Sequence, residues 1–324
     1  TPPSLNQCHA RFCTPERVFN FQSSLHPLLN SAGMKKDPKM TPIRTGVVGV
    51  GHLGYHHARN YAALEGAELV GVVDPHEANR DKAANDLTVP AFSDVKGLIA
   101  AGVDAVSVAT PTTTHSEVVN ELLQAGIHVL VEKPIAPTLH EAETMVALAK
   151  THKCLLQVGR GTDVSVVLDL MIHDLDIILA MEKSEVVSLD AVGVPVFSES
   201  EDIANVRIRF ESGCVANLTC SRVSLDRMRK IRIFESNAYL STDYSAQEVL
   251  VYRKKPGPIP EGSNPMEHIT MEPLPVEKDE PLKLELRSFV ECVREGRRPI
   301  VSGEDGVKAL RLAQDIMDFI RRHA

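Results

Sequence analysis

An aspartate and a histidine stand four residues apart in a strongly apolar segment, VSVVLDLMIHDLDIILAM, at residues 164–181. On a helix, at about 100° per residue, Asp169, His173 and Asp176 project within one narrow sector, and Asp174 points elsewhere. An imidazole suits proton transfer near neutral pH, and a neighbouring carboxylate can orient it. A polar stripe on a buried helix lines a cleft or an internal hydrogen-bond network. We therefore expect Asp169 and His173 to form either an acid–base pair or a structural one, and Asp176 to be structural or supporting.

A glycine-rich loop supplies a second kind of chemistry. The segment GVVGVGHLG places Gly49, Gly51 and Gly54 in the spacing G-x-G-x-x-G between an expected strand and an expected helix. The first glycine permits a tight turn, the second lets backbone approach a pyrophosphate, and the third lets helix pack on strand. The helix N-terminus then faces the anion. The loop predicts dinucleotide binding, with His52 and Leu53 among the contacts.

The next expected strand, AELVGVVD, ends at Asp74. A carboxylate at this place accepts hydrogen bonds from the adenosine ribose and repels a 2′-phosphate, so NAD is the expected cofactor and NADP is less favoured. The alternative is that Asp74 only opens the turn DPH. We interpret His52, His56 and His57 as loop or helix-surface residues rather than metal ligands.

Two later strand ends, VATPTTTH and VEKP, carry further polar residues. Ligands of doubly wound folds bind outside the carboxyl ends of the strands. The cofactor contacts predicted from these two segments are Thr110, Pro111, His115, Glu132 and Lys133. Lys133 would place a cation beside the nicotinamide, or it is simply a surface lysine before a turn proline.

The elements that must position these residues follow two patterns. Over residues 41–158, short apolar strands alternate with amphipathic helices, which predicts an α/β domain: a Rossmann doubly wound parallel sheet that binds NAD. Residues 159–324 carry consecutive strands and then two amphipathic helices, which predicts an α+β domain with an open, mainly antiparallel sheet. Residues 1–40 lack periodicity, and we expect an extension that is poorly ordered. A transit peptide, or a native start at Met34 or Met40, are the alternatives.

Composition excludes several classes of protein. The net charge of −8, the absence of Trp and an aromatic content of 4% argue against a nucleic-acid partner. No apolar run reaches the length of about 18 residues that spans a bilayer, so we expect no membrane partner and a cytoplasmic location. Six cysteines without a C-x-x-C pair are expected to be buried, reduced thiols. No metal site is predicted, because the Asp and His stripe lacks a third firm ligand.

Four motifs in this order, GVVGVGHLG, ATPTTTH, EKP and LDLMIHDLD, resemble the glucose-fructose oxidoreductase / inositol dehydrogenase / MocA (Gfo/Idh/MocA) family from Ile43 to the C-terminus. The resemblance implies an NAD(P)-binding domain and an α/β domain whose open sheet carries oligomer contacts, so a homodimer or homotetramer is expected. It also implies hydride transfer at a ring carbon of a sugar, cyclitol or sugar nucleotide. Lys133 matches the family's lysine of EKP, and Asp169 and His173 match its Asp and His four apart, which implies that all three are catalytic.

The substrate remains open among three alternatives. The segment DIANVRIRFESGCVANLTCSRVS is similar to the second domain of relatives of UDP-N-acetylglucosamine 3-dehydrogenase. A free sugar or inositol is the second alternative, and a non-catalytic NAD-binding sensor is the third.

One departure from the family pattern concerns the junction of the two domains. Family members carry some tens of residues between the strand LQVG and the Asp-His helix. Either this chain has lost that segment, or residues are omitted between Gly159 and Arg160, and we favour omission.

Overall fold

Two units, each with its own sheet, make up the computed structural model of this chain, whose side chains are described for residues 41–159, 166–225, 228–236, 238–276 and 279–323. Residues 7–13 are described by their backbone alone. Residues 160–165, including the expected gap after Gly159, lie outside the described residues. The unit that contains the glycine-rich loop, expected to bind a dinucleotide and called the nucleotide-binding unit below, comprises 41–159 and 279–311. The second unit comprises 7–13, 166–276 and 312–323.

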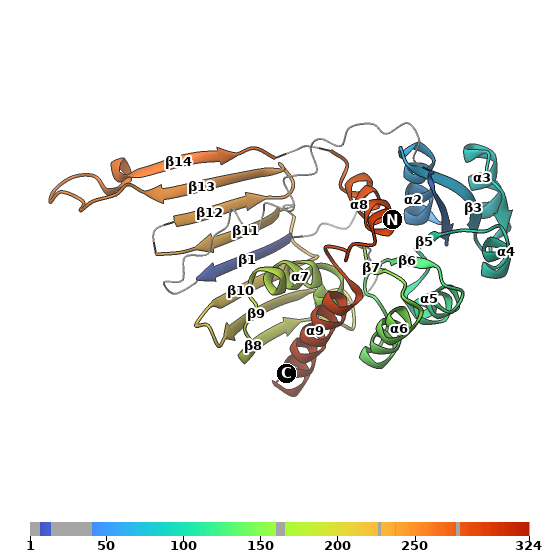
Figure 1. Ribbon diagram of the computed structural model, residues 1–324. Coiled ribbons are helices and arrows are strands. Elements are labelled where there is room, and N and C mark those ends of the chain that lie inside the picture. The colour runs from blue at the N-terminus through green and yellow to red at the C-terminus, as the bar shows by residue number, and fades with distance from the viewer. Residues whose placement is uncertain are drawn as a thin grey trace. The chain divides into compact units, whose positions relative to one another are not determined.

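The nucleotide-binding unit contains a six-stranded parallel sheet in the order β4-β3-β2-β5-β6-β7 (Figure 1). Its strands are β2 (Ile43–Val48), β3 (Ala67–Val73), β4 (Ala91–Phe92), β5 (Ala105–Val108), β6 (His128–Val131) and β7 (Leu156–Val158). Its helices are α2 (His52–Ala63), α3 (Glu77–Leu87), α4 (Val95–Ala100), η1 (Thr112–Thr114), α5 (His115–Gln124), α6 (Leu139–His152) and α8 (Pro281–Glu295). The predicted Rossmann fold is confirmed.

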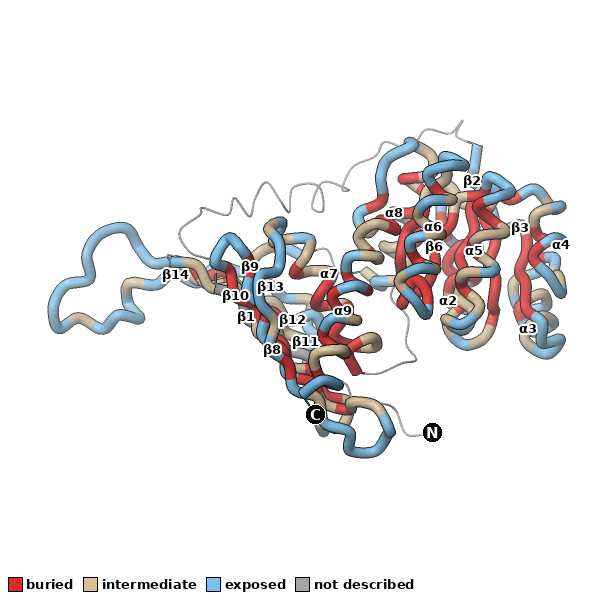
Figure 2. The backbone as a smooth tube through the Cα atoms, turned by 90° about the horizontal axis from the view of Figure 1, so that it is seen from below, coloured by how far each residue is buried: buried red, intermediate tan, exposed pale blue. Residues whose placement is uncertain are grey.

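Apolar composition explains why this sheet forms. Strand β5 is buried at every position. Strands β2 and β3 are buried toward their carboxyl ends (Figure 2). Such strands need helices on both faces of the sheet. The chain runs from β2 to β3 and β4 on one side and returns to β5, β6 and β7 on the other. The loops after β2 and β5 therefore meet at the topological switch point, where ligands of such folds bind.

Helix α8 packs in the nucleotide-binding unit, although we expected all of residues 159–324 to form the second domain. The physical reason is a matching apolar face. Leu286, Phe289 and Val290 share a core cluster with α2 and β2, and Arg294 Nη2 donates to the Gly66 carbonyl at 2.7 Å.

The second unit contains an eight-stranded sheet in the order β14-β13-β12-β11-β1-β10-β9-β8. Its strands are β1 (Gln7–Cys13), β8 (Val186–Val194), β9 (Ile203–Phe210), β10 (Val215–Ser221), β11 (Met228–Phe234), β12 (Ala238–Asp243), β13 (Glu248–Lys254) and β14 (Ile269–Leu274). Its helices are η2 (Val167–Met171), α7 (Ile172–Met181) and η3 (Pro265–His268). The boundary between the units falls within α9 (Gly303–His323). The predicted open, mainly antiparallel sheet is confirmed.

Strand β1 differs from the expected extension without order. Its backbone pairs antiparallel with β10 and parallel with β11, with seven residues in register on each side. These two strands would otherwise expose a row of backbone hydrogen-bonding groups, and β1 satisfies them. The rest of residues 1–40 lies outside the described residues.

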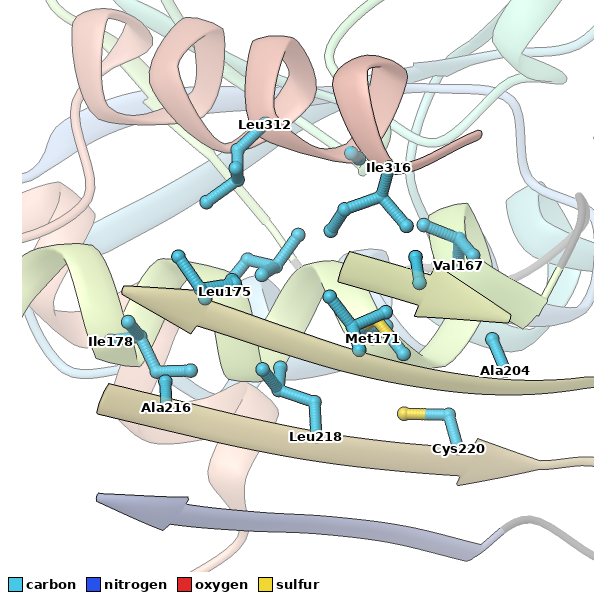
Figure 3. Close-up of a cluster of buried hydrophobic side chains, with 14 of the residues drawn as sticks. Val167, Met171, Leu175, Ile178, Ala204, Ala216, Leu218, Cys220, Leu312 and Ile316 are labelled. Carbon is cyan, nitrogen blue, oxygen red and sulfur yellow. The ribbon is translucent and has the colours of Figure 1, made fainter. Parts of the chain in front are cut away.

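Helices cover one face of this sheet. Figure 3 shows Met171, Leu175 and Ile178 facing Leu218 and its neighbours on the strands. In β9, alternate residues are buried, and the residues between them, Asn205, Arg207 and Arg209, are exposed on the opposite face.

Two further observations concern cysteines and membranes. Cys154, Cys214 and Cys292 carry reduced thiols, but Cys220 is disulfide-bonded, so the expectation of reduced thiols is wrong at that position. None of the helices in the described part of the chain is long and apolar enough to cross a membrane.

Candidate active site

The three glycines of the loop after β2 have three different surroundings. A Cβ on Gly49, whose φ is +84°, would lie 2.8 Å from the Ala109 carbonyl oxygen, and a Cβ on Gly54 would lie 1.7 Å from the Gly49 oxygen. A Cβ on Gly51 would meet nothing within 4 Å. The loop therefore needs glycine at two positions for its own packing. At Gly51 it leaves space into which a ligand can approach the backbone.

Helix α2 begins within this glycine motif, directly after Gly51, and includes Gly54. Its first turn contains no acidic residue, and no side chain caps its N-terminus. The unsatisfied backbone N–H groups and the helix dipole make such an end suitable for an anion. His52 is exposed there, and its ring stacks edge-on against that of His56 at 5.2 Å between centroids. Together with the open space at Gly51, this end of the helix fits the pyrophosphate of a dinucleotide.

Asp74 lies at the end of β3, beside the glycine loop, and is 4% exposed. Its Oδ2 accepts from the Val50 backbone N–H at 2.9 Å and from Asn79 Nδ2 at 3.3 Å, and its Oδ1 accepts from the His76 N–H at 2.9 Å. Asp74 thus fixes the loop through Val50. Its carboxyl group lies at the place where the ribose of a dinucleotide binds in this fold.

The loops that follow β5 and β6 are joined by His115, which is 1% exposed. Its Nε2 lies 2.9 Å from the Thr110 carbonyl oxygen, and its Nδ1 lies 3.0 Å from that of Pro134. Burial lowers the pKa of His115, although the two carbonyls oppose this, and a neutral ring donates to one of them. Both ring nitrogens contact backbone carbonyl oxygens, so His115 holds the loops of Thr110 and Pro134 in place.

His57 corrects the expectation of a surface histidine. It is fully buried, and its Nε2 lies 2.8 Å from Glu132 Oε1. The Glu132 carboxyl also packs against Gly159, where a Cβ would lie 3.3 Å from both of its oxygens. His57 Nδ1 and Glu132 Oε2 are buried and have no hydrogen-bond partner among the residues that the structure describes. Burying a polar atom without a hydrogen-bond partner costs free energy of folding. A role of Glu132 in binding a ligand would account for this cost.

Lys133, next to Glu132, is also buried, at 5% exposed, so the alternative of a surface lysine is wrong. The nucleotide-binding unit therefore brings together the loops of Gly49–Gly54, Asp74, Thr110 and Glu132–Lys133 at the carboxyl ends of its strands. Thr110 is half-buried and Pro111 exposed. Asp169 and His173 belong to the other unit.

The polar stripe has the predicted one-sided burial. Asp169, His173 and Asp176 are half-buried, whereas the residues between Asp169 and His173 are buried. Figure 3 shows Val167, Met171, Leu175 and Ile178 on the opposite, sheet-facing side. The stripe begins in a π-helical turn, η2, rather than in a regular α-helix. π-Helical turns are rare in proteins as a whole, but those that occur are frequently found at functional sites.

Asp174 lies on the buried side of the same helix. It is 6% exposed, and burial raises its pKa from 3.8 to about 7, while the charge of Arg229 partly opposes this shift. A carboxyl whose pKa is higher in the folded than in the unfolded state stabilises the fold most below pH 4. This stability is lost as the pH rises from about 4 to about 7.

Asp174→Asn is therefore expected to stabilise the protein at pH 8 and to leave it nearly unchanged at pH 4. At about 1.4 kcal/mol per pKa unit, the upper bound of the gain is roughly 4 kcal/mol. Urea unfolding of both proteins between pH 4 and pH 8 measures it. Asp190→Asn, at an exposed position of β8, is the control and should show no such trend. A constant difference between Asp174→Asn and the native protein over this range would contradict the assignment.

Comparisons with known proteins agree with this geometry. The model of the family described as an oxidoreductase family with an NAD-binding Rossmann fold (GFO/IDH/MocA) matches residues 43–160, and that of the GFO/IDH/MocA C-terminal domain matches residues 159–241. UDP-N-acetylglucosamine 3-dehydrogenase from Acidithiobacillus ferrooxidans is 32% identical over 310 residues, which cover 86% of this chain and 97% of that protein. The NAD(+)-dependent scyllo-inositol 2-dehydrogenase of Bacillus subtilis is 27% identical over 316 residues, with 81% and 90% covered.

Solved structures extend the likeness to the fold. A structure of the Acidithiobacillus ferrooxidans enzyme superposes with a TM-score of 0.79 at 32% identity, covering 87% of this chain and 98% of that one. The WlbA dehydrogenase from Bordetella pertussis, in complex with NADH and UDP-GlcNAcA, shares the fold at a TM-score of 0.70 and 18% identity, covering 87% and 96%. The glycine loop, the two-unit fold and these relatives together show that the chain belongs to the Gfo/Idh/MocA family of oxidoreductases.

Proposed function

We propose that this protein is an NAD-dependent dehydrogenase that acts on a ring hydroxyl of a sugar nucleotide of the UDP-N-acetylglucosamine type. The observation that carries the proposal is the likeness to UDP-N-acetylglucosamine 3-dehydrogenase, which extends over 97% of that relative's length. The buried Lys133 and the half-buried stripe of Asp169 and His173 support it, because a protein that only binds a nucleotide needs none of them. We assign it to the cytoplasm, where nucleotide sugars and NAD are used.

The cofactor contacts in this proposal follow the loops of the nucleotide-binding unit. Gly49, Gly51, His52, Leu53 and Gly54 hold the pyrophosphate at the start of α2. Asp74 binds the adenosine ribose and favours NAD over NADP by its charge. The remaining contacts are Thr110, Pro111, Glu132 and Lys133, held in part by His115.

Arg80, which lies beside Asp74, is a reason to compare NAD with NADP experimentally. Arg80 Nη1 donates to the Asp74 carbonyl oxygen at 3.0 Å. A guanidinium near this turn is the group that would meet the 2′-phosphate of NADP, so both cofactors belong in the assay.

The proposed chemistry divides among three side chains. When bound, NAD supplies the acceptor for the hydride that leaves the carbon of the hydroxyl group. His173 takes the hydroxyl proton as general base, and Asp169, one helical turn earlier, orients its ring. Lys133 donates a hydrogen bond to the same oxygen and stabilises its alkoxide character. In the reverse direction, His173 or Lys133 returns the proton.

A substrate screen tests this function. The purified protein is mixed with NAD or NADP and with UDP-N-acetylglucosamine, hexoses or inositols, and the absorbance of the reduced nicotinamide is followed. Turnover of the UDP-sugar with NAD is expected. Turnover of inositol alone would favour the activity named for the Bacillus subtilis relative. NADH binding without turnover of any compound would favour a redox sensor.

We also propose that the protein is a homodimer or homotetramer assembled through the open face of its eight-stranded sheet. On β11, β12 and β13, Phe234, Tyr239 and Tyr252 stack in a ladder, with ring centroids 4.8 and 5.1 Å apart. Met271, the register partner of Tyr252, is 60% exposed. Apolar and aromatic side chains of this kind are typical of interface cores.

Tyr252→Glu is expected to convert the oligomer into monomers, because it places a charge between Tyr239 and Met271 on this face. Light scattering coupled to size exclusion measures the mass. The control is Arg253→Glu, because successive residues of a strand point to opposite faces and Arg253 is exposed. A native protein of 35.5 kDa in solution, or an unchanged mass of Tyr252→Glu, would contradict the proposal.

A further inference from the structure

The loop between β8 and β9, residues 195–202, is organised around one buried carboxylate. Asp202 is 1% exposed, and its Oδ2 accepts from the backbone N–H groups of Val196, Phe197 and Ser198 at 2.8, 2.6 and 2.9 Å. Its Oδ1 accepts from Ser198 Oγ at 2.9 Å. Burial alone would raise the pKa of Asp202, but these hydrogen bonds outweigh it and hold the pKa well below its ordinary value. Asp202 is therefore a fixed anion.

This loop hydrogen-bonds to two segments: the start of the helix that carries Asp169, and the residue Arg222 that follows β10. At the start of the helix that carries Asp169 and His173, the Val166 N–H donates to the Glu201 carbonyl at 3.2 Å. After β10, the Arg222 N–H donates to the Asp202 carbonyl at 3.0 Å. The backbone of Val166 and the backbone of Arg222 are therefore both held by the same loop.

The Arg222 side chain lies between two carboxylates. Its Nη2 is 3.9 Å from Asp169 Oδ2, and its Nε is 3.9 Å from Asp202 Oδ1. At this distance the contacts are between charges rather than hydrogen bonds. Arg222 and Asp169 are only 26% and 14% exposed, so water and salt screen their attraction less than they would screen a surface pair.

We propose that Arg222 is a positioning residue for the reaction: anchored by the fixed Asp202, it holds the Asp169 carboxylate against His173. This inference rests on the proposed function, since it assigns to Arg222 an effect that passes through Asp169. Arg222 itself touches neither substrate nor cofactor in this scheme. A guanidinium that bridges two anions restricts where each can lie, and one of these anions is already fixed by the backbone.

Kinetics of five variants with UDP-N-acetylglucosamine and NAD test the proposal. Arg222→Met should lower kcat by about 30-fold, while KM and the Kd of NADH stay within about threefold, because binding groups are untouched. Arg222→Lys keeps the charge and should recover kcat to within about fivefold of the native value. Added to Asp169→Asn, the change Arg222→Met should lower kcat by less than about twofold, because the two changes remove the same effect. Arg321→Met, which removes another ion-paired arginine of this unit, is the control.

Three results would overturn the proposal. They are full kcat in Arg222→Met, an equal loss in Arg222→Lys, and the same fold-loss when Arg222→Met is added to the native protein and to Asp169→Asn. If Arg222→Met does not fold, Arg222→Gln takes its place. Normal kcat in Asp169→Asn would remove Asp169 from the proposed function, and the role of Arg222 with it. A low kcat in Asp169→Asn beside a normal one in Arg222→Met would remove only the role of Arg222.

Discussion

Gly54→Ala is expected to destabilise the protein by more than about 3 kcal/mol and to abolish NADH binding. The added Cβ would lie 1.7 Å from the Gly49 oxygen and 2.8 Å from the Gly49 carbonyl carbon. Both are backbone atoms, so α2 or the turn must move, and overpacking of this kind costs about 1–3 kcal/mol or more. Thermal unfolding and the quenching or enhancement of NADH fluorescence measure the two effects.

Gly51→Ala is the matched control, and the two variants separate folding from binding. A Cβ at Gly51 meets nothing within 4 Å, so we expect the melting temperature to change little. The methyl group would occupy the space through which the pyrophosphate approaches the backbone, so the Kd of NADH should rise about 30-fold, or roughly 2 kcal/mol. Unchanged NADH affinity in Gly51→Ala would show that the dinucleotide does not use this loop.

The parts of the site that could be predicted from the sequence are those set by local geometry. Gly49 and Gly54 are required by contacts within a few residues and with the neighbouring strand end. Asp74 follows its strand directly, and its contact with Val50 follows from adjacent parallel strands. The one-sided burial of Asp169 and His173 follows from helical periodicity. In each case the spacing along the chain fixes the arrangement in space.

The features that were not predicted depend on partners far away in the sequence. His57 was expected on a surface, but its partner Glu132 is 75 residues away and belongs to another strand end. Its position three residues after Gly54, on the helix that packs against the sheet, is the signal that could have indicated burial. Helix α8 was placed in the wrong unit because amphipathicity shows that a helix has an apolar face, but not which core receives it. Arg222 gave no local signal, since both carboxylates beside it come from other elements.

Lys133→Met and His173→Asn are each expected to lower kcat by about 10²–10⁴-fold while NADH binding is retained. A positioned general base contributes about this much, and loss of a hydrogen-bond donor to a developing alkoxide costs about 10²–10³-fold. His173 is not among the proposed cofactor contacts, so the Kd of NADH should not change in His173→Asn. Stopped-flow absorbance of the reduced nicotinamide measures the chemical step, and NADH fluorescence measures binding.

The two controls are Lys96→Met and His140→Asn, which remove the same side chains from exposed positions on α4 and α6. Near-normal turnover of Lys133→Met or His173→Asn would remove that residue from the chemistry. The double variant adds a further constraint. If Lys133 and His173 act on one oxygen of one substrate, their effects cannot be independent, and the double variant should lose much less than the product of the two single losses. Fully multiplicative losses would instead mean that Lys133 and His173 act on separate steps, and the shared substrate oxygen in the mechanism would be wrong.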